Sequence, residues 1–223
     1  MNLSYSSLSD MKRCLRCFYI DRKLNIKRPQ GIKSSMPENV DSILKESLEA
    51  FRGSLPPSLA AYEQLKGFTL YAGADLKKMR HWNSNPMNID LGGGHRVIGA
   101  LDDLLHNKET DVYAYLDYKT TGKEPGPQFG EMYYQSQCDI YTAMLVRAKR
   151  KHADFGVLLF FWPEKGEDDH VVFKSKAMFL KPDPDAAFKT FEKAITLLEG
   201  KLIPEADQAC EWCSWVGKHG NVK

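Results

Sequence analysis

Two acidic residues and a lysine are expected on two neighbouring strands of this chain, and they restrict its chemistry more than any other feature. One apolar segment carries Gly99 and Asp102, and the next ends with Asp117, Tyr118 and Lys119. Side chains alternate between the faces of a strand, so Asp117 and Lys119 share one face and Tyr118 takes the other. A hairpin between the segments would bring Asp102 beside Asp117. The sequence therefore predicts one site with two carboxylates and an ammonium group.

Such a site suits the metal-assisted cleavage of a phosphodiester. Carboxylate oxygens are the ligands that Mg²⁺ and Mn²⁺ prefer, and a nearby ammonium group can hold a phosphate oxygen or an attacking water. An isolated Asp-x-Lys triplet is common, however, and more often indicates charges on an exposed strand edge. The residues that accompany the triplet decide between these two interpretations.

A helix expected over Gly130 to His152 adds two polar residues to the pattern. Gln137 and Tyr141 lie four positions apart, so they share one face of this helix. For Tyr141, packing of the helix on the sheet is an explanation as good as contact with a ligand. The chain thus carries Gly-x-x-Asp, Asp-x-Lys and Gln-x-x-x-Tyr in this order, on strand, strand and helix.

From Gly99 to Tyr141 this ordered set resembles the PD-(D/E)XK nuclease superfamily, and within it the RecB-like branch. That branch includes the nuclease domains of recombination helicase-nucleases and small CRISPR-associated exonucleases. The resemblance implies an α/β fold with a restriction-endonuclease-like core, in which helices flank a mixed central sheet. It also implies an Mg²⁺- or Mn²⁺-dependent deoxyribonuclease that hydrolyses phosphodiester bonds.

The same resemblance implies roles for the residues at the strand ends. Asp102 and Asp117 would be metal ligands, with the backbone carbonyl of Tyr118 as a third. Lys119 would be the catalytic lysine, and Thr120 would offer a hydroxyl group to a phosphate. On the helix, the residues of the Gln-x-x-x-Tyr motif, Gln137 and Tyr141, would support the site and meet the DNA backbone.

The first-motif metal ligand is where this sequence departs from the family's pattern. Many relatives carry a histidine or a glutamate on the helix before the hairpin, but no histidine precedes His81. The matching helix is expected over Glu38 to Arg52 and is stopped by Gly53. Asp41 or Glu38 could replace the missing ligand, although acids at a helix N-terminus also complement the helix dipole.

The expected compartment determines how the cysteines are interpreted. The first ten residues are polar, and no stretch of about eighteen apolar residues is present to span a membrane. We therefore expect a cytoplasmic protein without a membrane association. In that reducing compartment, Cys-x-x-Cys pairs are more readily metal ligands than disulfides.

Four of the five cysteines form two such pairs near the opposite ends of the chain. The pairs are Cys14 with Cys17 and Cys210 with Cys213, whereas Cys138 lies in the apolar helix and is expected in the core. Four thiolates can hold a structural zinc ion or a 4Fe-4S cluster, and packed free thiols are the alternative. Several RecB-like relatives join their chain ends with a 4Fe-4S cluster, usually through one amino-terminal and three carboxy-terminal cysteines. The resemblance therefore implies a 4Fe-4S cluster, with a structural zinc ion as the alternative, although the division here is two and two.

Composition agrees with one domain over residues 1–223, with a core at about 38–200 and the cysteine clasp at 14–17 and 210–213. Hydrophobic residues make up 43% of the 223, enough for a core of this size. A net charge of +2 is too small to indicate nucleic-acid binding by itself. Basic residues nevertheless gather near the amino terminus and at the end of the long helix, and such clusters attract phosphates.

Hydrophobic periodicity and chain breakers predict the remaining elements. The first part of the chain is expected to form a helix from about Ser7, with Asp10 at capping-box spacing, an extended basic segment to Pro29, the helix Glu38 to Arg52 and a helical connector from Pro57 through Trp82. The middle is expected to form a strand Met87 to Leu91, a turn at Gly92 to Gly94, and strands Arg96 to Leu105 and Asp111 to Tyr118. The last part is expected to form a helix Gly130 to His152, strands Phe155 to Trp162 and His170 to Leu180, and a helix Asp183 to Glu199.

Three functions remain compatible with these residues. The first is a metal-dependent exonuclease on single-stranded DNA ends in recombination, repair or CRISPR adaptation, with protein partners in such a complex. The second is a catalytically inactive DNA-binding or assembly subunit with the same fold, which the missing histidine favours. The third is a redox or sensing protein built around the four cysteines.

Overall fold

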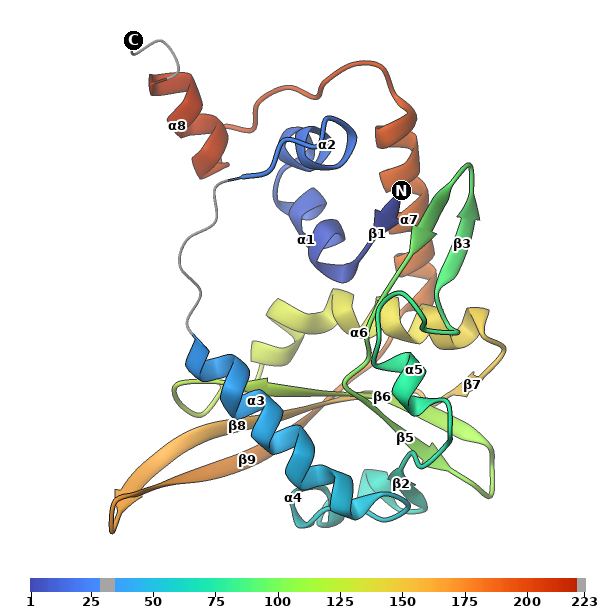
Figure 1. The fold of residues 1–223 in the computed structure, drawn as a ribbon, viewed down its shortest axis with the longest axis vertical. Helices are drawn as coiled ribbons and strands as arrows, with labels where there is room; N and C mark the ends of the chain where they lie inside the picture. Colours follow the sequence, from blue (N-terminus) through green and yellow to red (C-terminus); the bar gives the residue numbers. More distant parts are fainter. Residues whose placement is uncertain (29–34, 220–223) are drawn as a thin grey trace.

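The computed structural model describes residues 1–28 and 35–219, and its centre is a mixed sheet. In spatial order this sheet consists of β2 (Phe68–Leu70), β5 (Asp103–Asn107), β6 (Val112–Thr120), β8 (Gly156–Glu167) and β9 (His170–Leu180), with β7 (Lys151–His152) paired to the start of β6. β6 runs parallel to β8 and to β7, and the other neighbours are antiparallel. The predicted mixed sheet is therefore confirmed (Figure 1).

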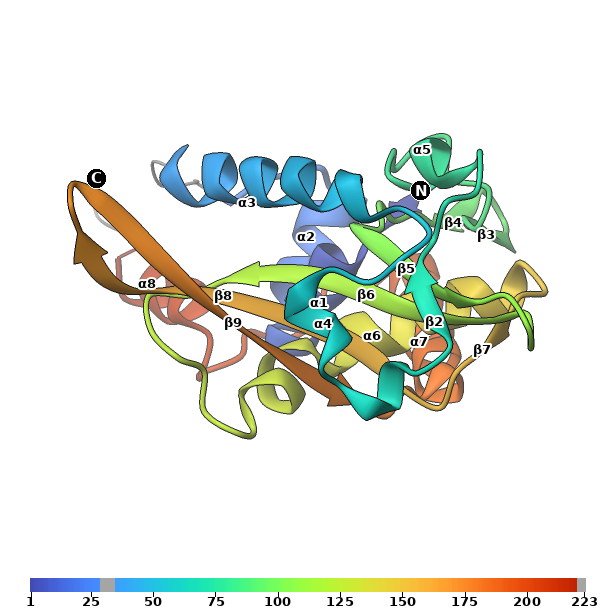
Figure 2. The same ribbon diagram turned by 90° about the horizontal axis from the view of Figure 1, so that it is seen from below.

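Helices cover both faces of this sheet (Figure 2). One face carries α3 (Ser35–Leu48), η1 (Glu49–Phe51), α4 (Pro57–Ala60) and η2 (Glu63–Leu65), and the other carries α6 (Phe129–Arg147) and α7 (Pro184–Glu199). The amino-terminal helices α1 (Tyr5–Arg13) and α2 (Leu15–Lys23) pack against α7. The short α5 (Leu76–Met79) precedes β3, and α8 (Glu211–His219) lies near the carboxyl end. No helix in the described ranges is both long enough and apolar enough to cross a membrane.

Strand β6 is buried on both faces, and its residues alternate strictly between two hydrophobic clusters. Tyr115 belongs to the cluster under α6, whereas Leu116 and Tyr118 belong to the cluster under α3. By the same alternation Asp117 and Lys119 lie on the α6 face. The predicted separation of Tyr118 from its two charged neighbours is confirmed.

A second, three-stranded sheet ties the amino terminus to the middle of the chain. Its order is β1 (Asn2–Leu3), β4 (His95–Val97) and β3 (Ile89–Gly92). The three glycines from Gly92 to Gly94 all have positive φ, between 58° and 79°, which residues with a side chain adopt rarely. The predicted hairpin turn is confirmed.

The strand predicted over Arg96 to Leu105 is wrong in its middle. β4 ends at Val97 and β5 begins at Asp103, so residues 98–102, including Asp102, lie outside any strand. In this segment, side-chain amides form the hydrogen bonds that a neighbouring strand would otherwise provide. Asn85 donates to the carbonyl of Gly99 at 2.8 Å, and Asn88 accepts from the Gly99 N–H at 3.1 Å. These bonds satisfy the backbone without a partner strand.

The amino-terminal predictions need correction as well. The first helix is capped by Ser4, which forms a capping box with Ser7, instead of by Ser7 with Asp10. The segment predicted to be extended as far as Pro29 contains α2, and its last residue lies outside the described ranges. α2 forms because Cys14 caps it through its sulfur, which accepts the N–H of Cys17.

Three other boundaries differ from the sequence pattern. The helix predicted over Glu38 to Arg52 begins at residue 35 and ends at 48, followed by η1. The predicted helical connector contains β2 between its short helices, because its Leu70 is buried opposite Leu105 of β5. The long helix ends at residue 147, and the left-handed conformation of Lys149 turns the chain into β7.

A fully buried carboxylate fixes where β5 begins. Asp103 accepts a bond from Arg52 Nη1 at 2.6 Å, from the Tyr118 hydroxyl at 2.7 Å and from Arg80 Nη2 at 3.2 Å, and it also pairs with Arg52 Nη2. Its side chain is completely inaccessible to solvent. Because a buried charge needs such partners, this network anchors the residue that directly follows Asp102.

We expect Arg52→Ala to lower the free energy of unfolding by about 3 kcal/mol, because it removes the strongest partner of a buried carboxylate. Urea denaturation followed by circular dichroism measures the change. Arg13→Ala is the matched control, since the Arg13 side chain is 74% exposed and pairs with Asp10 only at 4.0 Å. Equal effects of the two substitutions would contradict the assigned role of Arg52.

Candidate functional site

The first half of the predicted site is an ion pair at the end of β6. Lys119 Nζ pairs with Asp117 Oδ2, and the two side chains are 18% and 4% exposed. Gln137 of α6 donates from Nε2 to the other oxygen, Asp117 Oδ1, at 3.0 Å. Both oxygens of Asp117 are therefore held by side chains from its own strand and from the covering helix.

The second half is Asp102, in the turn before β5. Its Oδ2 accepts the backbone N–H of Tyr118 at 3.2 Å, and its Oδ1 pairs with Lys45 Nζ at 2.6 Å. Within a strand, the N–H and C=O of one residue point to the same edge. The carbonyl of Tyr118 consequently faces the edge that Asp102 occupies, beyond the last pairing of β5 with β6 at Leu116.

Burial and nearby charges set the protonation of these groups. Burial raises the pKa of Asp117 to about 6, and the negative charge of Asp102 adds to this effect, whereas Lys119 opposes it. Burial alone would lower the pKa of Lys119, but the paired Asp117 carboxylate outweighs it and raises that pKa above its usual value. Lys119 is therefore a permanent cation at neutral pH, suited to stabilising negative charge.

The aromatic ring of Tyr134 covers the catalytic-lysine candidate. Lys119 Nζ lies 4.6 Å from the centre of this ring, a cation-π contact. Tyr134 stands three residues before Gln137 on α6, so one helix face supplies both contacts. The spacing relative to Gln137 is a signal that sequence reasoning missed.

The third acidic candidate, Asp41, reaches the site only through a lysine. Lys45 Nζ lies 2.7 Å from Asp41 Oδ2 and 2.6 Å from Asp102 Oδ1, so it bridges the two acids. Within the ranges that the structure describes, Asp41, Asp102 and Asp117 do not bring their oxygens within 4.8 Å of one another. Lys45 was not predicted, although its position four residues after Asp41 on one helix face signals the pair.

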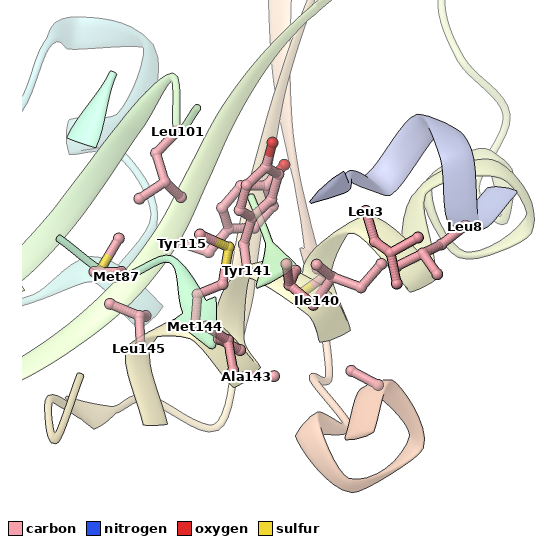
Figure 3. Packing of buried hydrophobic residues seen from close by; sticks show 14 of the residues in the cluster. Leu3, Leu8, Met87, Leu101, Tyr115, Ile140, Tyr141, Ala143, Met144 and Leu145 are labelled. Carbon is pink, nitrogen blue, oxygen red and sulfur yellow. The ribbon is translucent and has the colours of Figure 1, made fainter. Parts of the chain in front are cut away.

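Tyr141 and Gly99 explain the rest of the motif pattern. The Tyr141 hydroxyl donates to the carbonyl of Ala100 at 3.0 Å, and the centres of the Tyr141 and Tyr115 rings are 5.1 Å apart in a stacked arrangement. Figure 3 shows these two side chains. A Cβ atom on Gly99 would lie only 2.6 Å from the Tyr141 ring, so glycine is required there. Tyr141 is buried and positions the segment that leads to Asp102. Thr120 ends β6, next to the ion pair, and is partly exposed.

The donor set fits a divalent cation. Asp102 lies against the backbone N–H of Tyr118, and Asp117 directly precedes Tyr118 on β6. These two carboxylates and the Tyr118 carbonyl are hard oxygen ligands of the kind that Mg²⁺ and Mn²⁺ prefer. Each carboxylate is balanced by an ammonium group, Asp102 by Lys45 and Asp117 by Lys119. A divalent cation bound by these acids would therefore share or replace the charge pairing that the two lysines provide.

The four paired cysteines form a second candidate metal site. Their sulfur atoms all lie within 4.8 Å of one another, and the pairs Cys14–Cys213, Cys17–Cys210 and Cys17–Cys213 are each 3.7 Å apart. None forms a disulfide. The predicted four-cysteine clasp between the two ends of the chain is confirmed, and Cys138 is buried in the core as expected.

Side chains of α2 bind the carboxy-terminal segment that supplies half of the clasp. Tyr19 donates to the carbonyl of Gly200 at 3.1 Å, and Lys23 donates to that of Leu198 at 2.7 Å. Arg16 donates to the carbonyl of Pro204 at 3.0 Å. The guanidinium group of Arg28 lies 3.9 Å from Cys210 Sγ, a position that favours a thiolate.

Comparison with known proteins agrees with this geometry. The family model of the PD-(D/E)XK nuclease superfamily matches residues 2–217, nearly the whole chain. No curated protein matches the chain. With the mixed sheet, the Asp-x-Lys strand end and a match of this extent, the chain belongs to the PD-(D/E)XK nuclease superfamily.

Proposed function

We propose that the protein is a metal-dependent deoxyribonuclease of the RecB-like branch, an exonuclease that acts on single-stranded DNA ends in recombination, repair or CRISPR adaptation. The observation that carries the proposal is the buried ion pair of Asp117 and Lys119 next to the carboxylate of Asp102. The superfamily supports nuclease chemistry in general. The choice of single-stranded ends rests on the resemblance of the motifs to exonucleases.

Each residue of the site has a distinct task in this proposal. Asp102, Asp117 and the carbonyl of Tyr118 would hold Mg²⁺ or Mn²⁺, which supplies an activated water and neutralises charge on the phosphate. Lys119, a cation held in place by Asp117 and the ring of Tyr134, would stabilise the charge that develops on the phosphate. Gln137 keeps Asp117 oriented through its hydrogen bond.

One observation favours a second candidate, a DNA-binding or assembly subunit without activity. Asp102 is neutralised by Lys45, and Asp41 does not complete a three-carboxylate shell among the described residues. A subunit of this kind would retain DNA but leave it intact. Incubation of end-labelled single-stranded DNA with the protein and Mn²⁺ separates the two candidates, since only the enzyme produces fragments.

We expect Lys119→Ala to reduce Mn²⁺-dependent cleavage of single-stranded DNA by about a hundredfold or more, because the charge that stabilises the reacting phosphate is lost. Circular dichroism should show an intact fold. Lys66→Ala, at an exposed lysine paired with Glu63, removes the same charge elsewhere and should leave cleavage unchanged. Full cleavage activity of Lys119→Ala would refute the proposed catalytic role of Lys119.

We expect Lys45→Ala to bind Mn²⁺ about tenfold more tightly than the unaltered protein, because a divalent cation at Asp102 must displace the Lys45 ammonium group. Calorimetric titration measures the affinity directly, independently of catalysis. Lys66→Ala again controls for the change in net charge. Unchanged or weaker Mn²⁺ binding by Lys45→Ala would show that Lys45 does not compete for this position.

We further propose that the cysteine clasp holds a zinc ion. Four sulfurs at 2.3 Å from one tetrahedral ion stand about 3.8 Å apart. Three of the sulfur pairs here are 3.7 Å apart, and all four sulfurs lie within 4.8 Å of one another. In a 4Fe-4S cluster each thiolate binds a different iron, which requires a wider separation of the sulfurs. The spacing therefore supports the single ion.

Purified protein should be colourless and contain one zinc ion per chain by elemental analysis. Cys213→Ser should lose most of this zinc and unfold at a lower temperature, because the ion joins segments from both ends of the chain. Cys138→Ala alters a buried cysteine outside the clasp and should keep its zinc. A brown protein that contains iron and bleaches on reduction would refute the zinc assignment.

A further inference from the structure

The amino-terminal turns of α6 expose two large apolar side chains. Met132 is 71% exposed and Tyr133 is 58% exposed. With Phe129 and Tyr134 they form a surface that we call the stacking face. It borders an open cavity of about 510 Å³ lined by Gly126, Pro127, Gln128, Phe129, Met132 and Tyr133. Contiguous exposed apolar groups of this kind mark binding surfaces.

This stacking face continues directly from the candidate active site. Tyr133 lies four residues before Gln137 on α6, so the two share a helix face, with their Cβ atoms about 6 Å apart. Tyr134 covers Lys119 Nζ at 4.6 Å, and Gln137 donates to Asp117. The same helix therefore holds the ion pair through Gln137 and Tyr134 and, one turn before Gln137, exposes the aromatic ring of Tyr133.

The rings of the stacking face are held in place. The ring of Phe129 lies 4.7 Å from that of Tyr133, and both Phe129 and Tyr134 contact the buried ring of Phe160, at 5.8 and 6.0 Å. From α1, the hydroxyl of Tyr5 donates to the carbonyl of Tyr133 at 3.1 Å. A surface fixed in this way loses little conformational entropy when a ligand binds.

We propose that the stacking face binds an unpaired nucleobase of the DNA strand whose phosphodiester lies at Asp117 and Lys119. The inference rests on the proposed nuclease function and names the feature of the substrate that this surface would recognise. The base would stack on the ring of Tyr133 and contact the thioether of Met132. Stacking of this kind tolerates any base, because every base has a π-face.

The neighbouring charge favours a nucleotide over an apolar segment of a protein. A nucleotide carries a phosphate and an aromatic ring, and the surface offers the ammonium group of Lys119 beside the ring of Tyr134, followed by the exposed ring of Tyr133. In a duplex, both faces of an internal base are covered by its stacked neighbours, so only an unpaired or frayed base can use the stacking face. The site would thus discriminate single strands from duplexes.

The test compares DNA affinities by fluorescence anisotropy, with Ca²⁺ as the divalent cation and gels to verify that the probe stays intact. Tyr133→Ala should bind a short single-stranded oligonucleotide about tenfold more weakly than the unaltered protein. Its affinity for a blunt duplex of the same sequence should be unchanged. Tyr133→Phe should restore the single-strand affinity, and Val171→Ala, at a 59% exposed residue of β9, is the control.

An abasic nucleotide placed at successive positions of the strand locates the contact. At one position it should weaken binding by the unaltered protein about tenfold yet leave binding by Tyr133→Ala unchanged.

Three outcomes would overturn the inference: equal binding of single strands by Tyr133→Ala and the unaltered protein, an equal loss of affinity for the duplex, or no binding of single strands at all. Cleavage by the unaltered protein in Mn²⁺ is scored separately, so cutting without a Tyr133 effect refutes only this inference. A Tyr133 effect without cutting refutes only the enzyme.

Discussion

The buried ion pair of Asp117 and Lys119 is the interaction on which the rest of the site depends. Two charges inside a sheet covered on both faces cost several kcal/mol each unless they are paired and hydrogen-bonded. The chain meets this requirement with residues of one helix face, since Gln137 donates to Asp117 and the ring of Tyr134 covers Lys119. The position of α6 and the geometry of the ion pair therefore determine each other, and the exposed turn of α6 lies next to the ion pair.

The sequence predicts this ion pair well, because strand alternation alone places Asp117 and Lys119 on one face. It does not predict the setting of Asp102, since the hydrogen bonds of Asn85 and Asn88 that replace the expected strand come from residues more than ten positions away. Lys45 was missed for a related reason. Its partner Asp41 is near in sequence, but its link to Asp102 exists only once α3 packs beside the sheet.

Adjacent acids take opposite roles, and only the fold separates them. Asp103 is fully buried among Arg52, Arg80 and the hydroxyl of Tyr118, where it secures the start of β5. Asp102 instead accepts the backbone N–H of Tyr118 at the edge of β6 and pairs with Lys45. The cysteine clasp was, by contrast, predicted from the spacing of the two Cys-x-x-Cys pairs together with the expected reducing compartment, with packed free thiols as the alternative. The four sulfur atoms do lie within 4.8 Å of one another.

In the proposed site, the carboxylates of Asp102 and Asp117 hold one divalent cation between them. Crystals soaked in Mn²⁺ test it directly through anomalous scattering at the manganese absorption edge. We expect an anomalous peak in contact with oxygens of both residues and with the carbonyl of Tyr118. Crystals that show bound Mn²⁺ elsewhere but no peak touching either carboxylate would contradict it.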